Sequence, residues 1–153
     1  MKKGFTLLET VIAIGVLIIG TLMVYGATAR ILSQAQEEKT EFVASYLAQE
    51  GIEVVRNLRD TNWVSGAADW QEGLGAGAYR AQYNGSSLLA FQDVPLKLDA
   101  SHLYNYDSGT DTRFRRKITL SAPAADILKV TAEVSWPGQN SPLKAEEFLY
   151  NWY

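Results

Sequence analysis

The chain has 153 residues, no cysteine and a formal net charge of −3. This length is that of one ordinary domain, and the slightly negative charge gives no general expectation of nucleic-acid binding. The lack of cysteine excludes disulfide bonds and cysteine-containing metal clusters, so a domain outside the cytoplasm would depend on packing alone.

The first predicted element is a membrane-spanning helix. No charged residue occurs from Thr10 to Ala29, and a run of about 20 such residues can cross a bilayer core. Lys2 and Lys3 precede it, which predicts a cytoplasmic N-terminus and a C-terminal part across the membrane. A secretory signal peptide cleaved near Ala29 is the alternative. The length of the run and the helix-forming sequence that follows it argue against a signal peptide.

Residues 30–60 predict an amphipathic continuation of the same helix. The segment from Ile31 to Leu58 contains no proline, and its apolar residues recur at spacings of three and four. Charged and amide side chains occupy much of the other face. The stripe that we expect to be buried consists of Ile31, Ala35, Phe42, Val43, Tyr46, Leu47, Val54, Val55 and Leu58.

Residues 61–153 predict a small antiparallel sheet. The segment 61–80 is rich in glycine and tryptophan and indicates an irregular loop. Candidate strands follow at 78–83, 87–94, 96–99 and 113–121, and the strongest, at 127–136, alternates apolar and polar residues. Pro137 and Gly138 predict a turn. The tail at 143–153 is ambiguous between helix and strand, and its aromatic residues favour a last strand paired with 127–136.

The expected fold class is therefore α+β. A long N-terminal helix, with a transmembrane half and an amphipathic half, should pack through its second half on the antiparallel β-sheet.

The N-terminal sequence KKGFTLLETVIAIGVLIIG resembles that of type IV prepilins, a family that includes type IV pilins and the pseudopilins of type II secretion and competence. Its features are a short basic leader, Gly4, Phe5 and a glutamate, Glu9, as the fifth residue after the leader. The resemblance covers about the first 30 residues strongly. In addition, VTAEVSWPGQNSPLKAEEFLYNW looks like the terminal hairpin of minor pilins and minor pseudopilins.

The resemblance implies processing and assembly. A membrane prepilin peptidase would cut between Gly4 and Phe5 and methylate the new amine of Phe5. Glu9 would then neutralise the N-terminal amine of its own or a neighbouring subunit, because a lone carboxylate in hydrocarbon is costly and a paired one much less so. The alternative is a Glu9 carboxylate at the membrane interface, which the dipole of the helix N-terminus favours.

The implied function is that of a non-enzymatic structural subunit, most like a minor pilin, of a type IV pilus-like filament. Its parts would be a leader (1–4), a transmembrane and filament-core segment (5–29), an amphipathic helix (30–60) and a globular domain (61–153). The expected partners are other subunits, the prepilin peptidase, an inner-membrane assembly platform and, before assembly, lipid.

The resemblance also implies a location. The chain would first span the inner or cytoplasmic membrane once, with its C-terminal domain outside, and then enter an extracellular or periplasmic filament. One alternative is a type II secretion or competence pseudopilin. Another is a membrane-anchored binding domain that does not polymerise.

Other candidate chemistry is sparse. His102 is the single histidine, which argues against a metal cluster or a catalytic triad, so we expect neither an enzyme nor a cofactor. Asp107 and Asp111 are weak candidates for a calcium site, but they lack EF-hand spacing, and a solvated acidic turn is the preferred interpretation.

A basic strand and four tryptophans complete the candidates. Arg113, Arg115, Arg116 and Lys117 are weak candidates for contact with a DNA backbone. Because the chain is acidic, we favour a charged, protected edge strand and do not expect DNA as a partner. Tryptophans are more often core or loop anchors than carbohydrate platforms, and we expect the former for Trp63, Trp70, Trp136 and Trp152.

Overall fold

The structure is a computed structural model that describes Gly4 and residues 6–152. The chain divides into two compact units, Met1–Thr40 and Glu41–Tyr153. One helix, α1 (Leu7–Ser65), contributes residues to both.

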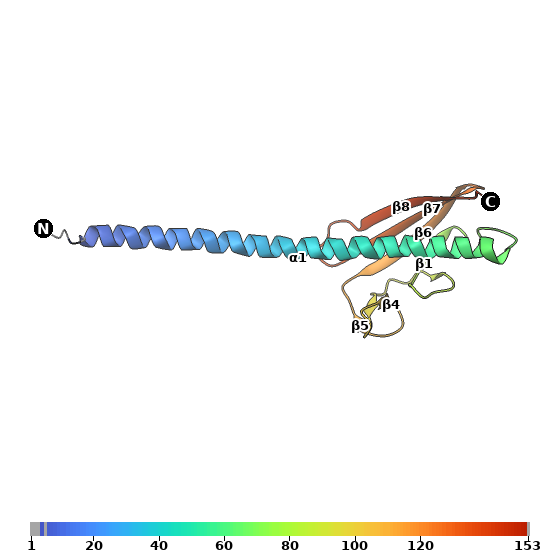
Figure 1. Cartoon of the computed structure of the whole chain (residues 1–153), viewed down its shortest axis with the longest axis horizontal. Coiled ribbons are helices and arrows are strands. Elements are labelled where there is room, and N and C mark those ends of the chain that lie inside the picture. The colour runs from blue at the N-terminus through green and yellow to red at the C-terminus, as the bar shows by residue number, and fades with distance from the viewer. Residues whose placement is uncertain (1–3, 5, 153) are drawn as a thin grey trace. The chain divides into compact units, whose positions relative to one another are not determined.

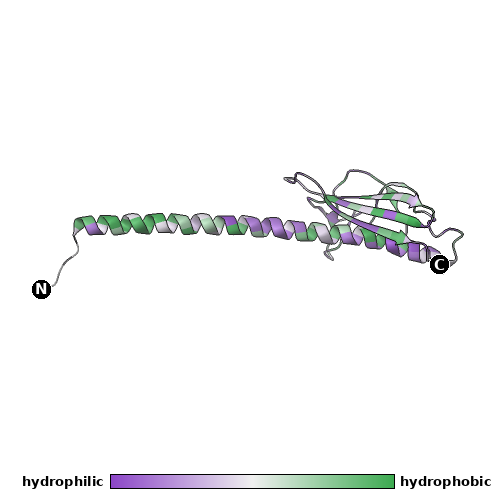
Figure 2. Cartoon of the chain, turned by 90° about the horizontal axis from the view of Figure 1, so that it is seen from above, coloured by the Kyte–Doolittle hydropathy of each residue, from purple (hydrophilic) through white to green (hydrophobic). Residues whose placement is uncertain are grey.

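The first unit contains the N-terminal part of α1. Thr6 precedes the helix, and its hydroxyl accepts a hydrogen bond from the backbone N–H of Glu9 at 3.3 Å, as an N-cap residue does. The unit contains an uncharged segment that is long and apolar enough to cross a membrane, and none of it is buried within the chain. Figure 2 shows this part of α1 coloured as hydrophobic along most of its length.

In the second unit, residues 41–65 of α1 pack against the larger sheet (Figure 1). The buried helix face includes several small residues, and this allows the backbone of the helix to approach the strands. A Cβ built on Gly51 would lie 2.5 Å from Cδ1 of Ile118. The buried helix residues are Ala44, Leu47, Ala48, Gly51, Ile52, Val54, Val55 and Arg59.

Two expectations about this helix are wrong. Four residues of the predicted buried stripe are exposed. Ile31 and Ala35 belong to the first unit, and Phe42 and Tyr46 are 68% and 66% exposed because the sheet covers the face with alanine and glycine. The helix also continues to Ser65, into the predicted loop. It ends in a Schellman motif at Gly66, whose φ is +71°. Backbone N–H groups of Gly66 and the next residue donate to the carbonyls of Trp63 and Asn62 at 3.2 and 2.9 Å.

The larger sheet has five strands in the order β2-β1-β6-β7-β8, and all its paired strands are antiparallel. The predicted alternation in β7 is confirmed, because Leu128, Val130, Ala132 and Val134 are buried. The predicted C-terminal strand is also confirmed, since β8 pairs with β7 along its length. The strands are β1 (Gly77–Arg80), β2 (Leu89–Ala90), β6 (Arg115–Ala124), β7 (Ile127–Ser135) and β8 (Leu143–Tyr150).

A smaller sheet was not expected. Its three strands, in the order β4-β3-β5, are β3 (Lys97–Leu98), β4 (Tyr104–Asn105) and β5 (Thr110–Asp111). The predicted strand 96–99 thus belongs to this sheet and not to the larger one. The two-residue strands have no periodic pattern, and hydrogen bonds from their surroundings position them: the backbone N–H and hydroxyl of Thr112 both donate to the carbonyl of Leu96.

The predicted α+β class, with a long N-terminal helix packed on a small antiparallel sheet, is confirmed.

Candidate functional site

The predicted processing residues precede α1 in the sequence, and the predicted assembly residue, Glu9, lies in its first turn. Gly4 is exposed, and Phe5 lies outside the described residues. Glu9 is the third residue of the helix, and its side chain is exposed. Its backbone N–H is occupied by the Thr6 hydroxyl, and the backbone N–H and the hydroxyl of Thr10 donate to the carbonyl of Thr6 at 3.1 Å each. The Glu9 carboxylate has no hydrogen-bond or ion-pair partner among residues 6–152.

The threonine hydroxyl groups of the apolar segment are satisfied within the helix. Thr21 donates to the carbonyl of Leu17 at 2.7 Å, and Thr28 donates to the carbonyl of Val24 at 2.9 Å. Such bonds to the preceding turn let threonine lie in an apolar environment. Within the described residues, the charged group beside the start of this segment that still needs a partner is the carboxylate of Glu9.

This segment exposes large apolar side chains of its own. Leu17, Ile18, Leu22 and Met23 are 54% to 70% exposed, and a shallow apolar groove of about 280 Å³ follows Ile14 to Leu22. This much exposed apolar surface on one helix requires lipid or other apolar helices to cover it.

No family model, curated protein or solved structure matches this chain.

The acidic candidates for a calcium site have other contacts. The Asp107 carboxylate accepts a hydrogen bond from the Gln82 side chain at 2.8 Å, and its backbone N–H donates to the Asn105 side chain at 2.9 Å. Asp111 lies on β5 opposite Lys97 of β3. Within the described residues, no group of three or more potential metal ligands occurs. Its side chain thus links the loop between β4 and β5 to the segment after β1.

The expectation that the basic strand is an edge strand is wrong, because β6 lies between β1 and β7. This strand also does not present a row of free cations. Arg115 contacts the carboxylate of Asp93 at 3.2 Å, and Lys117 contacts the carboxylate of Glu133 at 2.6 Å. Arg113 is exposed at the start of the strand region. Because neighbouring carboxylates compensate two of these charges, this face is a mixed-charge surface.

Arg116 is a core residue that sequence reasoning missed. Its side chain is fully buried and donates to the carbonyls of Leu47 and Ala81 and, at 3.0 Å, to the carboxylate of Glu50. It joins α1, β6 and the segment after β1. The alternation of inward and outward side chains along the strand could have indicated this burial, since Arg116 shares the inward face of β6 with Ile118. A guanidinium buried in the core of the domain cannot contact a DNA backbone.

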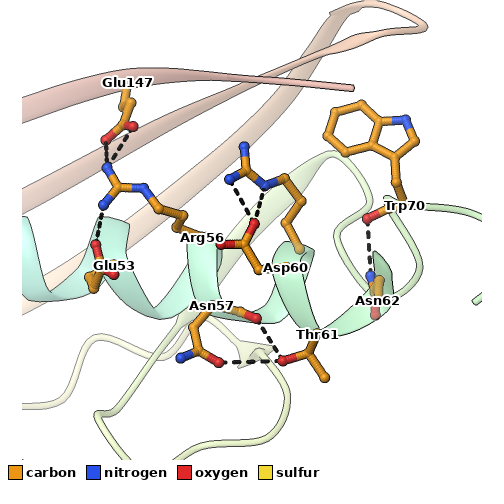
Figure 3. A network of polar contacts seen from close by, with 9 residues as sticks. Glu53, Arg56, Asn57, Asp60, Thr61, Asn62, Trp70 and Glu147 are labelled. Carbon is orange, nitrogen blue, oxygen red and sulfur yellow. Dashed lines mark hydrogen bonds and ion pairs between the residues drawn. The ribbon is translucent and has the colours of Figure 1, made fainter. Parts of the chain in front are cut away.

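Polar contacts along the last turns of α1 form a second cluster (Figure 3). Arg56 contacts Glu53 and, at 2.6 Å, Glu147 of β8. Arg59 donates to Asp60, and the Asn62 side chain donates to the carbonyls of Trp70 and Glu72 at 3.1 and 2.8 Å. These bonds attach both β8 and the loop after the helix to the end of α1.

Three indole rings lie at this end of the helix. Trp63 is stacked on Trp70 with ring centroids 6.3 Å apart, and it lies 5.8 Å from Trp152. Trp70 is buried, as expected of a loop anchor, whereas Trp152 is 73% exposed. The expectation that all four tryptophans are anchors is therefore wrong for Trp152.

Proposed function

We propose that this chain is a structural, non-enzymatic subunit of a type IV pilus-like filament. Its N-terminal leader would be removed at Gly4, and its apolar helix would then pack with those of other subunits. The observation that carries the proposal is the sequence GFTLLE followed by a helix whose first half exposes its apolar surface. The Glu9 carboxylate at the start of this helix is unpartnered within the described residues.

The physical argument concerns the cost of Glu9. A carboxylate that enters an apolar helix bundle alone pays a desolvation penalty of several kcal/mol, which a nearby cation reduces. Cleavage after Gly4 would create a new amine four residues before Glu9. A subunit packed among others could place this amine beside the carboxylate, so Glu9 would favour the assembled state over the free one.

The terminal hairpin supports a minor subunit over a major one. The resemblance of residues 130–152 to the end of minor pilins and minor pseudopilins motivates this choice. A type II secretion or competence pseudopilin is the alternative assembly, with the same processing and the same role for Glu9.

Processing is tested by replacing Gly4. The full chain and its Gly4→Leu variant are produced together with a prepilin peptidase, and the intact mass and N-terminal sequence are measured. We expect the parent to begin at methylated Phe5 and the variant to keep its leader, because a bulky side chain blocks access to the peptide bond. Gly15→Leu is the control, since nothing lies within 4 Å of a Cβ at Gly15, and it should be cleaved normally. A parent chain that begins after Ala29 would contradict the proposal.

Assembly is tested by replacing Glu9. We expect Glu9→Leu to be inserted and cleaved normally but to decrease at least tenfold in sheared filaments, because the amine loses its partner. Glu37→Leu, which removes an exposed carboxylate further along α1, should be incorporated like the parent. Normal incorporation of Glu9→Leu would exclude the pairing role. A parent that is processed but absent from every filament fraction would favour an anchored binding domain.

A further inference from the structure

We propose that the second unit binds a neutral saccharide in a groove at the end of α1. This tryptophan groove is lined by Asp60, Trp63, Val64 and Trp152 and has a volume of about 350 Å³. It lies wholly within residues 41–152. The proposal does not depend on filament assembly, because binding is a property of the single chain.

The groove offers an exposed apolar platform. Trp152 is 73% exposed and Val64 is 91% exposed, although both are large apolar side chains. Trp63 lies between Trp152 and the buried Trp70. The exposed ring of Trp152 therefore packs on a pair of indole rings that is anchored in the core. An aromatic face positioned in this way binds without first losing rotamer freedom, which lowers the cost of association.

The charges around the groove favour an uncharged ligand. Arg59 is only 3% exposed, and its guanidinium carbon lies 4.5 Å from the ring centre of Trp63 and 5.3 Å from that of Trp152. This cation already lies against the faces of both rings, so a cationic ligand would gain little cation–π attraction there.

Asp60 provides the polar contact. Nε and Nη2 of Arg59 lie 2.8 and 2.7 Å from Oδ1 of Asp60, which compensates the carboxylate charge and orients the group. Among the described residues, no hydrogen bond to Oδ2 is found, and the Asp60 side chain is 49% exposed. An oriented carboxylate oxygen beside indole rings can accept a hydrogen bond from a hydroxyl group. A carboxylate ligand is disfavoured there, because its oxygens, like Oδ2, are hydrogen-bond acceptors.

A pyranose ring has the matching chemistry. One face of the ring carries C–H groups whose partial positive charge suits the face of an indole, and the edge carries hydroxyl donors. The groove volume lies at the small end of the range for ligand sites, roughly 300 to 1,000 Å³. A short neutral oligosaccharide, with one sugar ring stacked on Trp152 and a hydroxyl on Asp60, is therefore the ligand class that we infer.

The test uses the full chain in a zwitterionic detergent without a sugar headgroup. Tryptophan fluorescence is measured against maltotetraose, cellotetraose and chitotetraose up to roughly 10 mM. Trigalacturonic acid and a deacetylated chitosan tetramer serve as anionic and cationic comparators. We expect saturable binding of at least one neutral tetrasaccharide and at least tenfold weaker binding of both charged ones.

Variants assign the binding to the groove. Trp152→Ala should weaken binding at least tenfold, and Trp152→Tyr, which keeps an aromatic face, should restore it to within a few-fold of the parent. Tyr150→Ala is the matched control, because Tyr150 is an exposed aromatic residue of β8 that does not line the groove, and it should bind like the parent. Thermal unfolding of each variant verifies that the domain is folded.

Any of the following results would overturn the proposal. The first is a lack of saturable binding of any neutral tetrasaccharide to the parent. The second is equal binding by the parent and Trp152→Ala, or binding of a charged comparator as tight as that of the neutral ones. The third is a parent that self-associates in sedimentation while Trp152→Ala does not, which would make the groove a contact between copies of the chain.

Discussion

At the scale of single residues, two glycines have the same backbone constraint but different surroundings. Gly109 and Gly138 have φ values of +121° and +90°. A Cβ at Gly109 would overlap the carbonyl of Leu98 in β3, whereas nothing lies within 4 Å of a Cβ at Gly138. A side chain at either position would therefore strain the backbone, and of the two only a side chain at Gly109 would also clash with a neighbouring strand.

We predict that Gly138→Ala lowers the free energy of unfolding by about 1 to 2 kcal/mol, the usual cost of a left-handed conformation for a residue with a side chain. Gly109→Ala should cost more, by at least about 1 kcal/mol, since the smaller sheet must also shift. Urea denaturation of the parent and both variants measures the difference. Equal losses would show that the loop before Thr110 relaxes without cost.

A second residue-scale prediction concerns pH. Hydrogen bonds from Lys117 and then Lys144 hold the pKa of the Glu133 carboxyl below its usual value of 4.5. The folded state therefore binds this proton less readily than the unfolded state does. Its stabilisation is present above about pH 4.5 and is lost as the pH falls through the lower, folded pKa.

Removing this carboxylate should make the free energy of unfolding depend less on pH in the acidic range. We expect Glu133→Gln to lower the free energy of unfolding at pH 7 by a few tenths to about 1 kcal/mol, as for other partly exposed ion pairs. The difference from the parent should shrink as the pH falls below about 4. Thermal unfolding between neutral pH and pH 3 measures both effects, with Glu72→Gln as the control. A constant difference across this range would exclude the linkage.

At the scale of elements, the edge strand β8 carries a carboxylate on its inward face. Glu147 is paired in register with the buried Val130 of β7, and both its oxygens accept a hydrogen bond from Nη2 of Arg56 at 2.6 Å (Figure 3). A charge on the inner face of an edge strand also disfavours the addition of a foreign strand. The ion pair therefore fixes β8 on α1.

A double-mutant cycle tests this attachment. We expect Arg56→Met and Glu147→Gln to be coupled by about 1 kcal/mol, since the side chains are 37% and 33% exposed and solvent screens the pair in part. Hydrogen exchange in β8 should be faster in either single variant, because the strand opens more readily. Additive effects on unfolding would mean that apolar packing alone holds β8.

At the scale of the whole molecule, the two units have different roles in folding. All residues of the hydrophobic core cluster, from Ala44 to Leu149, belong to the second unit. The first unit contains the apolar segment that no part of the chain buries. The second unit, about 110 residues long, is large enough to fold around one core.

We therefore predict that residues 41–153, expressed alone, form a folded and soluble domain with one cooperative thermal transition. The midpoint should lie within a few degrees of that of the full chain in detergent, because removal of residues 1–40 deletes no core side chain. Circular dichroism and differential scanning calorimetry measure the transition. A fragment without a cooperative transition would show that the N-terminal part of α1 is needed to stabilise the fold.

The predictions that succeeded concern interactions between residues close together in the chain. The apolar segment, the alternation of β7 and the final strand depend on neighbouring residues or on one hairpin, and each is found in the structure. Gly66 is a local signal that could have placed the end of α1 correctly. By contrast, Phe42 and Tyr46 fit a helical stripe but are exposed, because an apolar stripe does not reveal which of its neighbours the sheet will cover.

What the sequence by itself determined is the order and type of the main elements, together with an N-terminal motif that resembles a prepilin. Local hydrogen bonding, turn residues and hydrophobic periodicity are sufficient for these. Only the tertiary structure decided that Arg116 is buried, that 97–111 forms a separate sheet and that Trp63 and Trp152 share a groove with Asp60. Each depends on residues far apart in the chain, which meet only after the helix and sheet have packed.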